Sequence, residues 1–152
     1  MTTENKIDVI YKWVMAQKGE LPNDIPEVAE MSYDEEIIEE VLTDIGVSRS
    51  LSGFRYTVWA VKEILANEHI LKGIVKSLYV PGGCYFGITT SSFERSIRHA
   101  KDSVVCQSDT MTATATRLFG DRVHYDRIAN KAFLATIASE VKKRKKLHKF
   151  DI

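Results

Sequence analysis

The sequence predicts an all-α fold, a compact domain of several helices, and three observations support this prediction. Apolar residues recur at spacings of three and four through most of the chain, which places them on one face of a helix. Strand signals are weak by comparison. Hydrophobic residues make up 44% of the 152 residues and charged residues 28%, as in an ordinary globular domain with a real core.

The N-terminal part is expected to contain two helices joined by an irregular linker. The first helix is predicted by four apolar residues at helical spacing, Ile7, Ile10, Tyr11 and Val14. Pro22 and Pro26 then disfavour helix. The second helix is expected to start at Ser32 or Asp34, because either side chain can cap it, and to end at Gly46.

The rest of the chain is almost continuous amphipathic helix in its pattern. The expected apolar stripes are Phe54, Val58, Val61 and Leu65, then Ile70, Ile74 and Leu78, and finally Phe133, Leu134, Ile137, Ala138 and Val141. A further helix over about residues 109–119 is expected to end at Gly120. We therefore divide the chain into an acidic N-terminal helix and linker, residues 1–33, and a helical domain, residues 34–152.

One element of this domain contains residues that disfavour helix. The stretch "VPGGC" at 80–84 holds Gly82 and Gly83, each of which costs about 1 kcal/mol relative to Ala inside a helix. Pro81 is acceptable only in a first turn. We expect this helix to be shortened or irregular.

The stretch "TTSSFERSIRHAKDSVV", residues 89–105, predicts an amphipathic helix over about 91–105. Ser91 and Glu94 have the spacing of a capping box, in which each side chain accepts from a backbone amide of the other. The apolar face is expected to consist of Phe93, Ile97, Ala100 and Val104. Arg95 and Arg98 then point away from that face, with Glu94, Lys101 and His99 flanking them.

Two arginines one turn apart near the start of an exposed helix suit the major groove of DNA, where arginine can bond to both acceptors of guanine. Gly87 lies where a helix-turn-helix bends, and the preceding residues 78–86 would supply its first helix. The alternative from the residues alone is an ordinary solvated surface.

Short motifs in a fixed order connect this stretch to a known family. They are "IGV" at 45–47, "GFRY" at 53–56, "LY" at 78–79, Phe86, "TTSSFERSIRHA" at 89–100, "LFG" at 118–120 and "LHK" at 147–149. With them, residues 38–149 resemble the C-terminal DNA-binding domain of the sporulation initiation factor, the master response regulator of endospore-forming bacteria. The resemblance implies a domain of about six helices that binds a short asymmetric DNA box, usually as two copies in tandem. The family's regulator begins with a receiver domain, which the residues before this match are too few to hold.

The resemblance also implies site residues. The family's base-contacting positions fall on Glu94, Arg95 and Arg98. Further candidate DNA contacts are Ser91, Ser92, His99, Lys101 and Lys149; Ser92 stands where the family has a basic residue, and Lys149 matches a basic residue close to phosphate. For Glu94 a purely capping role stays open, and for His99 a packed or solvated histidine does.

Charge is distributed unevenly along the chain, although the net charge is zero. Residues 1–45 hold twelve acids and three lysines, a balance of −9, and residues 46–152 hold nine acids and eighteen Lys or Arg, a balance of +9. Such asymmetry indicates a nucleic-acid partner for the basic part or a contact between the two parts. One hypothesis is that residues 1–33 fold against the basic domain and compete with DNA; packing elsewhere or a dimer contact is the alternative. The basic tail "KKRKKLHK", residues 142–149, is either a solvated helix end or a phosphate contact.

Other classes of function find little support in the sequence. No apolar run is long enough to cross a membrane, and the first residues lack the pattern of a signal peptide, so we expect a cytoplasmic protein. The four histidines and two cysteines show no metal-ligand spacing, and no cofactor, small-molecule substrate or enzymatic motif is expected. We expect double-stranded DNA as the partner, with a homodimer or tandem binding on DNA. The alternative is a protein-interaction module of the same fold that has lost DNA binding and modulates a full-length regulator.

Overall fold

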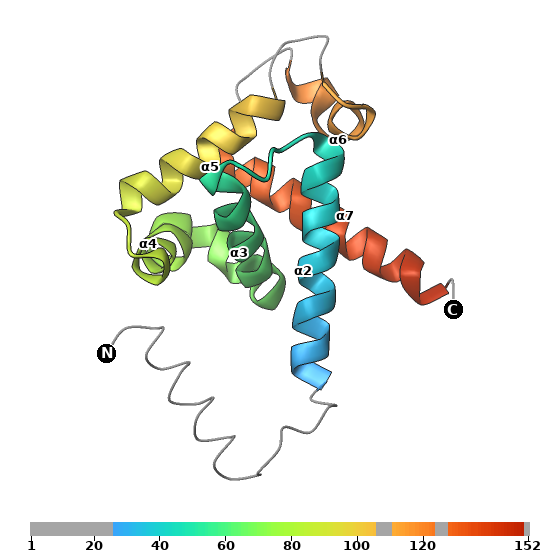
Figure 1. The fold of residues 1–152 in the computed structure, drawn as a ribbon, viewed down its shortest axis with the longest axis horizontal. Coiled ribbons are helices and arrows are strands. Elements are labelled where there is room, and N and C mark those ends of the chain that lie inside the picture. Colours follow the sequence, from blue (N-terminus) through green and yellow to red (C-terminus); the bar gives the residue numbers. More distant parts are fainter. Residues whose placement is uncertain (1–25, 106–110, 124–127, 151–152) are drawn as a thin grey trace.

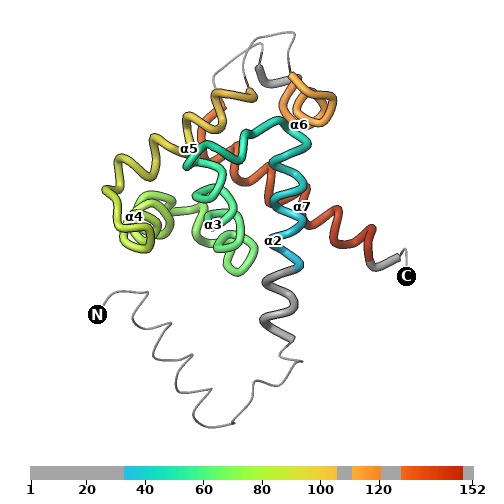
Figure 2. Tube along the Cα trace, viewed as in Figure 1, coloured from blue at the N-terminus to red at the C-terminus, as the bar shows by residue number. Residues whose placement is uncertain are grey.

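The computed structural model describes the backbone of residues 26–105, 111–123 and 128–150, and the side chains of residues 33–105, 111–120 and 128–148 (Figures 1 and 2). These residues form six α-helices: α2 (Pro26–Ile45), α3 (Ser52–Ala66), α4 (Val80–Phe86), α5 (Thr90–Val104), α6 (Ala113–Val123) and α7 (Asn130–Phe150). A 3₁₀ segment, η1 (Glu68–Gly73), and a π-helical segment, η2 (Val75–Tyr79), lie between α3 and α4. The described part contains no strand, so the predicted all-α fold is confirmed.

Helix α3 lies at the centre of the domain, where it packs against α2, α5 and α7 (Figure 1). Helices α2 and α7 cross each other, and α4 packs against α5. The core draws fully buried side chains from nearly every helix, among them Ile38, Val61, Phe93, Phe119 and Phe133. Burying a large apolar side chain stabilises the fold by about 1.5–3 kcal/mol, so this shared core accounts for the cohesion of short helices.

The predicted start of α2 was wrong, and its predicted end is confirmed. The helix begins at Pro26, before Ser32 and Asp34, because a proline at the first helical position lacks only an amide that would have no partner there. It ends before Gly46, which has a φ of 99°. The amides of Gly46 and Val47 both donate to the carbonyl of Leu42, at 3.2 and 2.9 Å, which closes the last turn. The predicted helix over residues 7–14 lies outside the described residues.

The predicted apolar stripes over residues 54–65 and 133–141 are confirmed. Phe54, Val58 and Val61 of α3 are buried, and so are all five predicted positions of α7. Of the predicted stripe, Ile70 and Leu78 are buried and Ile74 is partly buried, but the segment is not one regular helix, because η1 and η2 have different periods. Helix α6 continues past Gly120 to Val123, so the predicted end at that glycine was wrong.

The expectation of a shortened element at "VPGGC" is confirmed, and the structure explains the glycines. Helix α4 has seven residues, with Pro81 in its first turn. A Cβ on Gly82 would lie 2.4 Å from the ring of Phe93, and one on Gly83 would lie 2.8 Å from the carbonyl oxygen of Ile88. Gly82 therefore allows α4 to approach α5 closely, and Gly83 allows the turn to pass close to α4; this packing offsets their low helix propensity.

Candidate nucleic-acid interface

Helices α4 and α5 are joined by a tight turn centred on Gly87. This residue has a φ of 70°, a left-handed conformation that glycine adopts without strain. The amide of Gly87 donates to Cys84 O at 3.3 Å, and the amide of Ile88 donates to Gly83 O at 2.9 Å. The turn follows α4 and leads directly into α5 (Figure 1). This is the predicted helix-turn-helix arrangement, with α5 as its second helix.

The cap of α5 differs from the predicted capping box. Thr89 is the N-cap residue, and its Oγ1 accepts from the amide of Ser92 at 3.0 Å. The Thr89 hydroxyl also donates to Ser92 Oγ at 2.8 Å. The capping role predicted for Ser91 and Glu94 was therefore wrong, because the helix starts earlier, at Thr90. Thr89 offers the same hydroxyl chemistry as Ser91 but lies outside the helix, where a cap must be.

The two faces of α5 agree with the predicted pattern. Phe93, Ile97, Ala100 and Val104 are buried, as expected. Arg95 is exposed, and the side chain of Arg98 is 49% exposed. Ser91, Ser92 and His99 are exposed as well, so these predicted site residues of the first three turns share an accessible surface.

Lys101 is the exception among the predicted contacts on α5. It was expected beside the exposed face, but it is only 6% exposed. Its ammonium group donates to the backbone carbonyl of Ile128 at 2.5 Å and lies 3.6 Å from Asp102 Oδ1. A buried ammonium group needs such partners, and the long aliphatic stem of lysine lets it reach across to the segment before α7. The expected exposure of Lys101 was wrong, and its ammonium group serves the fold.

Glu94 is held between the exposed arginines and the start of α7. Its Oε1 accepts from Asn130 Nδ2 at 3.2 Å, and its Oε2 lies 3.7 Å from Arg98 Nη2. Sequence reasoning missed Asn130, although an asparagine directly before an apolar helical stripe is a recognisable helix-start signal. Its side chain turns toward α5 instead of capping α7.

Two cations of the basic tail form ion pairs with acids of α2. Arg144 Nη1 lies 2.8 Å from both Glu40 Oε1 and Asp44 Oδ2 of α2, and Lys145 Nζ lies 2.6 Å from Asp34 Oδ1. A contact between the acidic and basic parts, one of the predicted meanings of the charge asymmetry, is therefore present here. The side chain of Lys149 and the segment 1–25 lie outside the described residues.

Glu140 of α7 connects this ionic cluster to α6. It is 5% exposed, and Arg117 Nη2 donates to its Oε1 at 2.8 Å, while Arg144 Nε donates to the same atom at 3.3 Å. The hydrogen bond from Arg117 lowers the pKa of Glu140, with Arg144 adding to the effect against the cost of burial. Burial works against the charge of Arg144, but the hydrogen bonds that it donates to Asp44 and Glu140 raise its pKa.

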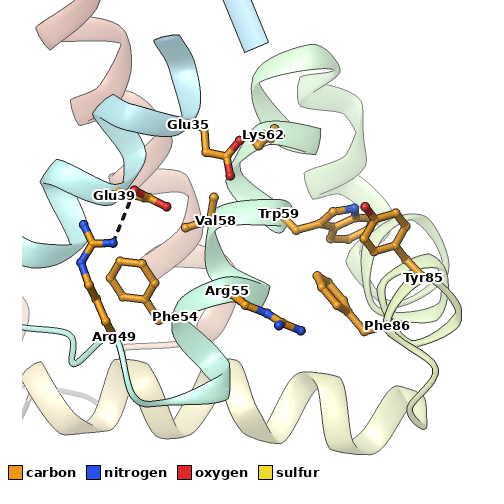
Figure 3. A pocket seen from close by; sticks show the side chains of 10 residues that line it. All are labelled: Glu35, Glu39, Arg49, Phe54, Arg55, Val58, Trp59, Lys62, Tyr85 and Phe86. Atoms are coloured by element: carbon orange, nitrogen blue, oxygen red, sulfur yellow. Dashed lines mark hydrogen bonds and ion pairs between the residues drawn. The ribbon is translucent and has the colours of Figure 1, made fainter. Parts of the chain in front are cut away.

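A groove of about 340 Å³ lies on another surface, between α2, α3 and α4 (Figure 3). The ring of Trp59 stacks on that of Tyr85 with centroids 5.7 Å apart, and the guanidinium of Arg55 lies 5.5 Å from the centre of the Phe86 ring. Acids of α2 balance the other two cations that line the groove: Lys62 pairs with Glu35 at 3.4 Å, and Arg49 pairs with Glu39 at 3.5 Å. The lining of the groove therefore carries three cations against two acids.

Three further findings concern the described residues alone. They contain no group of three or more His, Cys, Asp or Glu placed to hold a metal ion. None of their helices combines the length and the apolar character needed to span a bilayer. Cys84 is an exposed free thiol.

The fold and the exposed surface of α5 together indicate a class of protein. An all-α domain with a helix-turn-helix whose second helix exposes two arginines has the features of DNA-binding domains of the helix-turn-helix class. Residues 38–141 match the family described as sporulation initiation factor Spo0A C terminal. Since the match covers more than half of the chain, this protein belongs to that family, whose members are DNA-binding domains of transcription regulators in sporulation. The resemblance inferred from the sequence is thereby confirmed.

Proposed function

We propose that this protein is a transcription regulator that binds a short DNA box sequence-specifically, with α5 in the major groove. The observation that carries the proposal is the exposure of Arg95 and Arg98 on the helix that follows the Gly87 turn. A groove about 12 Å wide admits one helix, and the first turns of that helix meet the base edges. Each arginine would bond bidentately to a guanine, which contributes about 1–3 kcal/mol of discrimination.

The neighbouring residues would share the work in different ways. Glu94 would accept from a cytosine amino group, because its carboxylate is partly exposed and Thr89 already caps the helix. Ser91, Ser92 and His99 are exposed on the same helix and would contact the backbone or base edges, and Lys149 would contact phosphate. Lys101 has no part in the proposal, because its ammonium group is buried.

Affinity would be modest for a domain of this class. Phosphate contacts supply most of the sequence-independent affinity, and α4 carries no Lys or Arg in "VPGGCYF". Two copies on neighbouring boxes would compensate for the missing phosphate contacts, so we propose tandem binding. We also propose that the protein acts in the cytoplasm, where bacterial DNA is. A module of this fold without DNA binding is not favoured, because the family and the intact α4–turn–α5 unit both indicate DNA.

Fluorescence anisotropy on a labelled duplex carrying the family's box, compared with a scrambled duplex, tests the proposal. Wild type is expected to prefer the box, and Arg95→Ala and Arg98→Ala are each expected to lower that preference about tenfold. Lys72→Ala is the matched control, because it removes one exposed positive charge from η1. Equal affinity of the wild type for both duplexes would contradict sequence-specific binding to this box.

A further inference from the structure

The proposed DNA-binding helix, α5, makes a polar contact with the start of α7. Asn130, the first residue of α7, is 8% exposed, and its Nδ2 donates to two acceptors of one residue of α5. These acceptors are the backbone carbonyl of Glu94 at 3.3 Å and its Oε1 at 3.2 Å. An amide nitrogen carries two donors, which is enough for both acceptors of Glu94.

This double contact determines where the Glu94 carboxylate lies. With Oε1 held by Asn130, Oε2 is directed along the helix and lies 3.7 Å from Arg98 Nη2. A glutamate and an arginine four residues apart on a solvated helix normally sample several rotamers and contribute only about 0.3–0.5 kcal/mol of pairing. A carboxylate already fixed on one side restricts the guanidinium that pairs with it.

The same segment also anchors α5 two turns further along. Lys101 donates to the carbonyl of Ile128, two residues before Asn130. Tyr79 of η2 completes the surroundings: burial raises its pKa, and its hydroxyl lies beside Asn130 and Glu94. The two anchors hold α5 against the start of α7, and of the two Asn130 is the one that contacts Glu94, the ion-pair partner of Arg98.

We propose that Asn130 is a positioning residue for DNA recognition: through Glu94 it holds Arg98 in the orientation in which its guanidinium contacts a base. This inference rests on the proposed function of α5. It assigns a specificity role to a buried residue of another helix that does not touch DNA. Ordering a long side chain before binding removes an entropic cost that would otherwise be incurred on contact with one particular base pair.

The test is a double-mutant cycle on the full chain, with Asn130→Ala, Arg98→Ala and both together, measured by anisotropy on the box duplex and the scrambled duplex. Asn130→Ala is expected to lower the ratio of the two affinities about fivefold, while the affinity for the scrambled duplex stays unchanged. In the Arg98→Ala background the same change is expected to have no further effect on the ratio. Ser139→Ala is the control, an exposed substitution on the same helix.

The outcomes separate this inference from the proposed function. If Arg98→Ala lowers the ratio and Asn130→Ala does not, or if the two losses simply add, the positioning role is overturned while the function of α5 stands. If Arg98→Ala leaves the ratio unchanged, the proposed function fails and takes this inference with it. Asn130→Asp keeps the side-chain volume, loses the donor and repels Glu94. Asn130→Asp is expected to lower the ratio of the affinities for the box and scrambled duplexes at least as much as Asn130→Ala. If circular dichroism shows that Asn130→Ala is unfolded, Asn130→Asp replaces it as the test of the positioning role.

Discussion

Two helix contacts in this domain are held together in different ways. The contact between α4 and α5 is apolar and close, with Gly82 directly against the ring of Phe93. The contact between α2 and α7 includes ion pairs, which Arg144 and Lys145 of α7 form with three acids of α2. The difference shows that basic residues have separate uses on α5 and on α7. On α5 the arginines remain accessible because the fold is held by other groups, whereas on α7 several cations are used by the fold.

The largest effect is expected where the α4–α5 contact is closest. Gly82→Ala would place a Cβ 2.4 Å from the fully buried Phe93 ring, which has no space to move, so we expect a loss of about 3 kcal/mol in the free energy of unfolding. Urea denaturation measures this loss. Gly73→Ala is the matched control, because its Cβ would meet only Ser77 Oγ at an ordinary 3.7 Å. Equal stability of the two variants would show that the helices are not as close as described.

The next effect belongs to the ionic contact and depends on pH. Glu140 has a pKa below its ordinary value of 4.5, so its contribution to stability is present above pH 4.5 and is lost as the pH falls through the lower folded value. Glu140→Gln is expected to cost about 2 kcal/mol at neutral pH, a moderate value because Arg117 is largely exposed and screened by solvent. Thermal unfolding from pH 7 to pH 3 should show a smaller acid-induced loss in this variant. An unchanged pH profile would place the acid sensitivity elsewhere.

A smaller effect tests the anchor of α5. Lys101→Met keeps the aliphatic stem but leaves the Ile128 carbonyl without its ammonium donor, so we expect a loss of about 1–1.5 kcal/mol in stability. The dependence of DNA affinity on salt should stay as in the wild type, because a buried ammonium group contacts no phosphate. A shallower salt dependence, measured by anisotropy, would restore Lys101 to the DNA contacts.

The smallest effect is expected from a single pair at the edge of the α2–α7 contact. Lys145→Ala breaks the pair with Asp34, and pairs of this partly exposed kind contribute less than about 1 kcal/mol. Chemical denaturation at low and at high salt should show a difference from the wild type only at low salt. A loss comparable to that of Glu140→Gln would mean that the outer pair matters as much as the buried carboxylate.

Local patterns were sufficient for much of the fold. The apolar faces of α3, α5 and α7 were predictable because helical spacing selects the buried side. The start of α2 at Pro26 and the continuation of α6 past Gly120 were not, because Pro and Gly stop helices only in certain positions and contexts. The segment from Glu68 to Tyr79 has a helical pattern, but tertiary packing imposes 3₁₀ and π geometry on it.

The candidate site was predictable where it depends on one helix and unpredictable where it depends on two. The exposure of Arg95 and Arg98 follows from the period of α5. The burial of Lys101 and the contact from Asn130 depend on how α7 begins beside α5, some thirty residues away in the chain. No periodicity within α5 contains that information.

The pairing of Arg144 and Lys145 with α2 has a consequence for the thermodynamics of DNA binding. A protein cation expels condensed counterions from DNA only if it is free to neutralise a phosphate. Side chains already neutralised by Glu40, Asp44 and Asp34 have little left to exchange. Each cation that does neutralise a phosphate contributes roughly −0.9 to the slope of log K against log salt. The count of basic residues in the chain is therefore a poor guide to the entropy gained when this domain releases counterions from DNA.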